Sequence, residues 1–108
     1  MILGLDLDGV ITDTPEFFSC WTQSWPGQVI VITYRKDLAR AIADLEERNI
    51  RFDEVVLVDR FEAKAEVIAE HGVTMHVDDQ PEILKHIPAG VRVMLFRTEG
   101  NFDFDDRR

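Results

Sequence analysis

Residues 2–12 read ILGLDLDGVIT, and the rest of the chain is best understood from this stretch. It begins as a short apolar run, as a buried strand does, and it ends in two carboxylates, Asp6 and Asp8, with Gly9 at the turn. Side chains two residues apart on an extended chain point the same way, so the two carboxylates are expected side by side. Their repulsion requires water, a shared proton or a cation. A strand followed by an ordinary polar turn would give the same pattern.

The composition indicates one domain, residues 1–108, with a core of modest size. Hydrophobic residues make up 45% of the chain, which excludes a disordered segment, and no apolar stretch is long enough to span a bilayer. The first residues do not resemble a signal peptide. Cys20 is the only cysteine, so no internal disulfide can form, and we expect a reducing, cytoplasmic location.

The net charge of -9 argues against non-specific binding to nucleic acid or to an anionic membrane. A phosphorylated ligand remains possible, because a bound divalent cation can reverse the local potential.

Strands are predicted to alternate with helices along the chain. The predicted strands are 1–6, 28–33, 54–58, 73–77 and 91–96, and the predicted helices are 15–25, 37–49, 61–71 and 80–86. The β-branched run at 28–33 shows no alternation, which is typical of a strand covered on both faces. We therefore predict an α/β fold with a doubly wound, Rossmann-like parallel sheet of about five strands and helices on both faces.

Some side chains outside the sheet also carry expectations. Four aromatic residues of the predicted helix 15–25 fall on one broad face that we expect to pack on the sheet: Phe17, Phe18, Trp21 and Trp25. Cys20 on the same helix is expected to be partly buried. Residues 97–108 contain few apolar side chains and are predicted to form a loosely packed tail.

Polar residues follow several of the predicted strands. Asp6 and Asp8 follow the first, Thr33 ends the second, and Asp78 and Asp79 follow the fourth. Ligands of parallel α/β sheets bind at the carboxyl ends of the strands, so these residues are expected to meet there. Two charges ~4 Å apart interact by about 4 kcal/mol at an effective dielectric of 20. A hard divalent cation would relieve this repulsion, and oxygen-only ligands favour Mg²⁺ over Zn²⁺.

Lys64 lies in the first turn of the predicted helix 61–71, where a cation opposes the helix dipole. Exposure to solvent would make this placement acceptable. Alternatively, Lys64 leans over the strand ends and faces the carboxylates and an anionic ligand, for which a helix start is already favourable.

These residues together resemble the haloacid dehalogenase-like (HAD) hydrolase superfamily. Four motifs of that superfamily are matched in order along the chain. They are the stretch Asp6-Leu-Asp-Gly-Val, Thr33 at a strand end, Lys64, and Asp78-Asp79 at a strand end. The resemblance covers residues 1 to about 96. The spacing of Asp6 and Asp8, two positions apart, resembles that of the phosphatase branch of the superfamily.

The resemblance implies a role for each residue in phosphate-monoester hydrolysis. Asp6 would be the nucleophile that forms an aspartyl-phosphate, and Asp8 would be the general acid and base. Thr33 would donate its hydroxyl to a phosphoryl oxygen, and Lys64 would neutralise charge on Asp6 and the phosphoryl group.

The resemblance also implies Mg²⁺ as cofactor. Asp78, with Asp79 beside it, would hold the ion together with Asp6 and the backbone carbonyl of Asp8. The substrate would be a phosphorylated molecule, either small or macromolecular.

Members of the superfamily often carry an inserted cap domain, but residues 9–32 and 34–63 are filled by predicted helices and strands. We therefore expect a capless member whose open site takes a bulky substrate or is closed by the tail or by a second copy in a homo-oligomer. Arg35 is a candidate for gripping a second anionic group of the substrate, although a solvated arginine at the start of a loop is an equal possibility.

Other residues receive no role from the sequence: Asp13, Asp59, Arg60, His71, His76 and His86. Two alternatives to a phosphatase remain. A response-regulator receiver domain shares acids, threonine and lysine, but in another order along the chain. A catalytically silent binding module of the same fold would keep the residues without the reaction.

Overall fold

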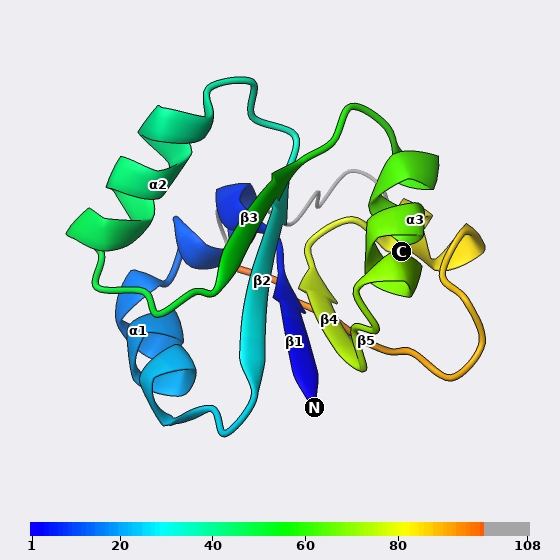
Figure 1. The fold of residues 1–108 in the computed structure, drawn as a ribbon, viewed down its shortest axis with the longest axis horizontal. Helices are drawn as coiled ribbons and strands as arrows, with labels where there is room; N and C mark the ends of the chain where they lie inside the picture. The colour runs from blue at the N-terminus through cyan, green and yellow to red at the C-terminus, as the bar shows by residue number, and fades with distance from the viewer. Residues whose placement is uncertain (99–108) are drawn as a thin grey trace.

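The computed structural model describes residues 1–98, and it contains a single parallel sheet of five strands in the order β3-β2-β1-β4-β5 (Figure 1). The strands are β1 (Ile2–Leu5), β2 (Gln28–Thr33), β3 (Glu54–Leu57), β4 (Met75–Asp78) and β5 (Arg92–Leu95). The helices are α1 (Pro15–Ser24), α2 (Leu38–Glu47) and α3 (Phe61–Glu70), with a π-helical turn η1 (Leu7–Ile11) and a 3₁₀ helix η2 (Pro81–Lys85). The predicted α/β fold with a parallel sheet is confirmed, and the helix expected at 80–86 is this short 3₁₀ helix.

Helices cover both faces of the sheet, as the unbroken apolar run of β2 predicted. Val29 and Val31 point into a core that includes Phe18 of α1 and Leu45 of α2. Ile30 and Ile32 point the other way, into a second core that includes Ile68 of α3. Figure 1 shows the same division, with α1 and α2 on one side of the strands and α3 on the other.

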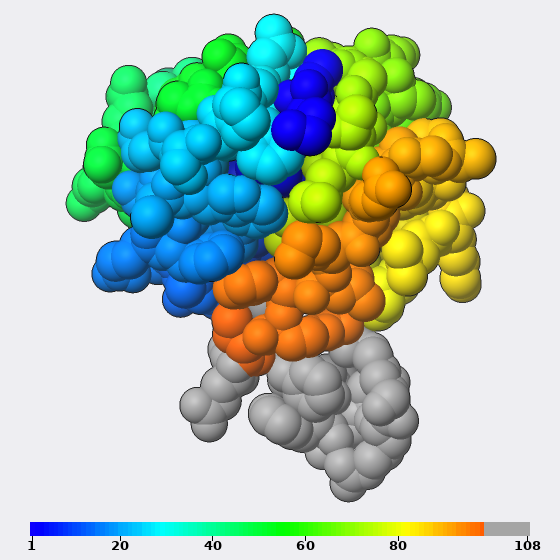
Figure 2. Space-filling view, turned by 90° about the horizontal axis from the view of Figure 1, so that it is seen from below, coloured from blue at the N-terminus to red at the C-terminus, as the bar shows by residue number. Residues whose placement is uncertain are grey.

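The strand order reverses at β1, which lies between β2 and β4. Figure 2, seen from the edge where the chain begins, shows the start of β1 in dark blue between segments in the colours of β2 and β4. In open α/β sheets the ligand crevice lies at the carboxyl ends of the strands flanking such a reversal, here β1 and β4. The order also differs from the 2-1-3-4-5 order of the flavodoxin-like fold of receiver domains, which excludes that alternative.

The aromatic face of α1 differs from the expectation. Phe18 is fully buried and Trp21 and Trp25 pack partly buried against the core, but Phe17 is 53% exposed. The prediction that Cys20 is partly buried is also wrong, because it is exposed. The helix is turned so that only part of the predicted face meets the sheet.

Two further expectations concern the membrane and the tail. None of the described helices is long and apolar enough to cross a membrane. Of the predicted tail 97–108, residues 99–108 lie outside the described part of the chain.

The adjacent phenylalanines of α1 provide a matched test of this packing. Phe18→Ala is expected to lower the free energy of unfolding by about 3–5 kcal/mol, because it opens a cavity in the core. Phe17→Ala, on an exposed side chain, should change it by less than about 1 kcal/mol. Urea unfolding followed by circular dichroism measures both, and equal losses would contradict the orientation of α1.

Candidate active site

Asp6 lies where β1 ends and the chain leaves the sheet. Its backbone N–H donates to the carbonyl of Val77 in β4 (3.1 Å), and its buried carboxylate accepts from the N–H of Leu7 (2.9 Å). The turn η1 then begins, closed by a hydrogen bond from the N–H of Thr12 to the carbonyl of Leu7 (3.1 Å). Because η1 interrupts the strand after Asp6, with Asp8 extended again (φ -77°, ψ 133°) and Gly9 at positive φ, the regular alternation that was expected to align Asp8 with Asp6 stops here.

Lys64 is fully buried, so the solvent-exposed alternative is wrong. From the first turn of α3 its ammonium donates to Oδ2 of Asp78 (2.9 Å) and lies 3.4 Å from Oδ1 of Asp6. The same Nζ lies 4.5 Å from the centre of the Tyr34 ring. A buried ammonium is tolerated only with such partners, because taking it out of water costs several kcal/mol.

Three carboxylates meet at this point: Asp6, Asp78 and Asp79 each offer an oxygen within 4.8 Å of the others. Burial raises the pKa of Asp6 well above its usual value; Lys64 opposes this, and the neighbouring carboxylates add to it. Burial also raises the pKa of Asp79, partly offset by a hydrogen bond with Asp6. Three carboxylates beside one ammonium leave an excess of negative charge that a divalent cation would balance, and oxygen donors suit Mg²⁺.

Gly9 lets the first loop approach these carboxylates. Its φ of +82° favours glycine, and a Cβ at this position would clash with the carboxylate of Asp79. The glycine after Asp8 therefore turns the chain and also leaves room for the acidic group.

Asp78 is held by three donors. Its Oδ2 accepts from Lys64 and lies 2.9 Å from Nε2 of His76, and its Oδ1 accepts from the N–H of Gln80 (3.0 Å). Burial alone would raise the pKa of Asp78, but His76 and Lys64 hold it well below its usual range. Burial lowers the pKa of His76. Because an ionised carboxylate can only accept hydrogen bonds, the Nε2 of His76 donates to Asp78.

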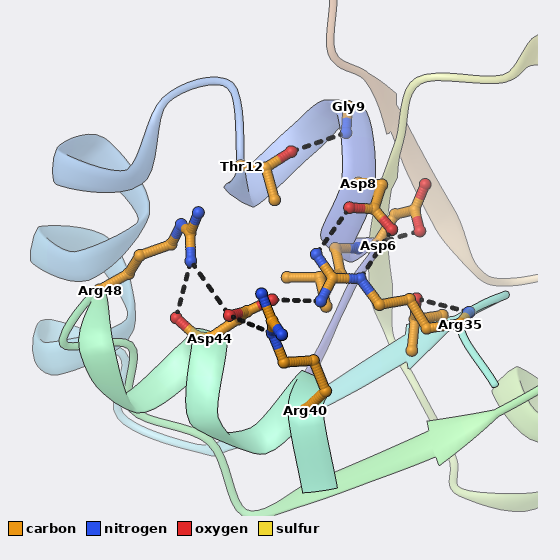
Figure 3. Close-up of polar contacts among 10 residues, drawn as sticks. Asp6, Asp8, Gly9, Thr12, Arg35, Arg40, Asp44 and Arg48 are labelled. Carbon is orange, nitrogen blue, oxygen red and sulfur yellow. Dashed lines mark hydrogen bonds and ion pairs between the residues drawn. The ribbon is translucent and has the colours of Figure 1, made fainter. Parts of the chain in front are cut away.

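Asp8 and Arg35 form a separate ion pair beside this group (Figure 3). Arg35 binds the Asp8 carboxylate with two parallel bonds, from Nε (3.0 Å) and Nη2 (2.9 Å), and its Nη1 donates to Asp44 of α2. Arg40 and Arg48 also bind Asp44. The Asp8 carboxylate, 60% exposed, is therefore not among the clustered three. Binding of Mg²⁺ by its backbone carbonyl, and of a substrate anion by Arg35, stay predictions.

A cleft of about 390 Å³ opens above these groups. It is lined by Asp6, Asp8, Gly9, Asp13, Thr33, Tyr34, Asp79 and Gln80. The hydroxyl oxygen of Thr33, at the end of β2, accepts from the N–H of Arg35 (3.2 Å), so its hydrogen is left to donate to a ligand. The structure thus brings the site residues predicted from the sequence to one edge of the sheet. Lys64 and Asp78 lie beneath the cleft.

The residues that sequence reasoning left without a role divide into two groups. Asp13 lines the cleft, and His76 touches Asp78. The others have contacts elsewhere: Asp59 forms an ion pair with Arg60, His71 lies beside Glu54, and His86 lies near Glu62. The position of His76 two residues before Asp78 on a strand was the available signal, because that spacing puts both side chains on one face.

Lys64→Met should lower the free energy of unfolding at pH 7 by about 3–5 kcal/mol, because Asp6 and Asp78 lose their buried cation. The depressed pKa of Asp78 means that this stabilisation is present above the usual carboxyl pKa and is lost as the pH falls. The difference between the two proteins should therefore shrink in acid. Urea unfolding in chelator measures it, with the exposed Lys36→Met as control; similar losses in both variants would contradict the buried cluster.

Asp79→Asn should raise the melting temperature of the metal-free protein at pH 7–8. A raised carboxyl pKa contributes stability that is full at low pH and is lost as the pH rises through it, so the ionised group costs stability near neutrality. Each 1 kcal/mol corresponds to about 4–8 °C in a domain of this size. Mg²⁺ should stabilise the wild type and have a smaller effect on the variant. A melting temperature of Asp79→Asn below that of the wild type in chelator would contradict the repulsion between Asp79 and the neighbouring carboxylates.

No protein-family model matches the chain, and no match was found among curated proteins or solved structures. The function is therefore inferred from the side-chain geometry.

Proposed function

We propose that the chain is a Mg²⁺-dependent phosphatase of the HAD-like type that its motifs resemble, and that it hydrolyses a phosphate monoester through an aspartyl-phosphate on Asp6. The supporting observation is the fully buried Lys64 between Asp6 and Asp78, at the crevice between β1 and β4. A buried ion pair of this kind is a poor way to stabilise a fold, since an apolar cluster of similar volume is often as stable. A requirement for concentrated charge at a reaction site explains it better.

In the first half of the reaction, a carboxylate oxygen of Asp6 attacks phosphorus, and the bond from phosphorus to the leaving oxygen breaks. Asp8 supplies the proton that the leaving oxygen takes up. The ammonium of Lys64 and the hydroxyl of Thr33 stabilise negative charge as it shifts during the transfer.

In the second half, Asp8 removes a proton from water as the water oxygen attacks phosphorus. The bond between phosphorus and Asp6 breaks, inorganic phosphate leaves, and Asp8 is again protonated. In the structure both oxygens of the Asp8 carboxylate accept hydrogen bonds from Arg35.

The donor set fits Mg²⁺. Asp6, Asp78 and Asp79 would hold the ion, with the backbone carbonyl of Asp8, and bound Mg²⁺ would act as a Lewis acid that offsets phosphoryl charge. Together with Lys64 it would also keep Asp6 ionised, against the burial that raises its pKa.

A second candidate is a catalytically silent module that binds phosphate without hydrolysing it. The bidentate contact of Arg35 with Asp8 favours this candidate, because both oxygens of the proposed acid and base are already bound by the guanidinium. Both candidates would bind phosphate and Mg²⁺, but only the phosphatase would hydrolyse a phosphate monoester.

The cleft suggests an open site. Within residues 1–98, the segments between the proposed catalytic positions form strands and helices of the one sheet domain, with η1, rather than a separate cap. We propose a phosphorylated substrate that leaves much of its body in solvent, or a site closed by a second copy of the chain.

Asp6→Asn should reduce hydrolysis of p-nitrophenyl phosphate to the background rate, because the amide cannot act as the nucleophile. Chelator should abolish the wild-type activity, and excess Mg²⁺ should restore it. Asp59→Asn, the same change on a side chain that is 82% exposed, should leave turnover unchanged.

Equal turnover with Mg²⁺, with chelator and in Asp6→Asn would contradict the phosphatase. Phosphate and Mg²⁺ binding by calorimetry, with no turnover of a panel of phosphorylated metabolites, nucleotides, sugars and phosphopeptides, would support the binding module.

A further inference from the structure

The imidazole of His76 lies beneath the candidate metal site, on the face of the sheet covered by α3. His76 and Asp78 are two residues apart on β4, so both side chains point to this face. The histidine is fully buried, and its Nε2 lies 2.9 Å from Oδ2 of Asp78, the oxygen that also accepts from Lys64. The mechanism proposed above gives this histidine no task.

The neighbouring strand leaves space for the ring. Gly4 of β1 pairs with His76 in the register of the two strands. A Cβ at Gly4 would lie 2.8 Å from Nδ1 of His76 and 3.0 Å from a methyl of Val73, so a larger residue would push the ring aside. A glycine inside a strand weakens it, and here it occurs where the imidazole needs room.

The other ring nitrogen gains little from its burial. Nδ1 is buried without a well-formed hydrogen bond to a described residue, and only the backbone of Gly4 lies near enough to interact with it. Burying an unsatisfied polar atom is unfavourable, and an apolar side chain would avoid that loss. The hydrogen bond from Nε2 to Asp78 is the specific contact that offsets this loss.

We infer that His76 is a positioning residue, which fixes the Asp78 carboxylate for Mg²⁺ by donating from Nε2 to Oδ2, and that Gly4 is required because it admits the ring. This inference rests on the proposed function of the site. With Lys64 and Gln80, the imidazole fixes both the rotation and the charge of Asp78. Donors behind a metal ligand commonly change metal affinity 10–100-fold when they are removed.

The test compares His76→Gln with His76→Met, two unbranched side chains of similar size. Glutamine carries an N–H where Nε2 was, and methionine carries no donor. We expect His76→Met to raise the Kd for Mg²⁺, measured by calorimetry on the folded protein, about 10–100-fold. His76→Gln should stay near the wild-type Kd. Hydrolysis of p-nitrophenyl phosphate by His76→Met should need correspondingly more Mg²⁺ and recover when Mg²⁺ is raised.

Gly4→Ala is a second variant that keeps the imidazole but crowds it, and it should weaken Mg²⁺ binding in the same direction. It also keeps the inference testable if His76→Met fails to fold. A histidine that only fills the core would change the melting temperature of these variants but leave the Kd for Mg²⁺ unchanged, and that result overturns the inference. Tight Mg²⁺ binding in every variant refutes only the role of His76, whereas a wild-type protein without affinity for Mg²⁺ refutes the proposed site as well.

Discussion

The contact of the Lys64 ammonium with Asp6 and Asp78 is the interaction on which the arrangement of the site depends. A charge removed from water is tolerated only where opposite charges meet it at short distance. The three residues come from α3, from the end of β1 and from the end of β4, so these elements cannot shift independently without exposing or isolating a charge. The buried cluster is thus a strong constraint on how α3 packs on the sheet.

The topology explains why the charges gather where they do. With β1 central and the order reversing on it, the carboxyl ends of β1 and β4 adjoin, and the segments that follow diverge. The chain after β1 turns through η1 toward α1, while the chain after β4 passes to η2. Between them the cleft remains open to solvent, with Asp6 and Asp79 in its lining.

Much of the fold followed from local patterns. Strands such as 28–33 were recognisable because β-branched runs covered on both faces do not alternate, and the predicted helices 15–25, 37–49 and 61–71 end within a few positions of α1, α2 and α3. The strand order did not follow, because it depends on contacts between distant segments. The orientation of α1 could not be predicted from helical spacing alone. Phe17 and Phe18 are adjacent, but Phe17 is exposed and Phe18 is buried, and this difference depends on how the helix packs against the sheet.

The site was predictable as a set of residues more than as a set of contacts. The meeting of Asp6, Asp78 and Asp79 followed from strand ends on a parallel sheet. The partner of Asp8 did not, because η1 interrupts the regular strand and an ion pair between two loops leaves no spacing to detect in the sequence. His76 was missed although its spacing from Asp78 puts both side chains on one face, because the room for its ring comes from a glycine in another strand.

The relay from Asp8 through Arg35 to Asp44 has a consequence of its own. Asp8 and Arg35 are partly exposed to solvent, whereas Lys64 and Asp78 are buried. Dissolved ions screen exposed charge pairs far more than buried ones. Raising the ionic strength should therefore weaken the ion pairs that link Asp8 to α2. It should have little effect on the buried contacts of Lys64 with Asp6 and Asp78.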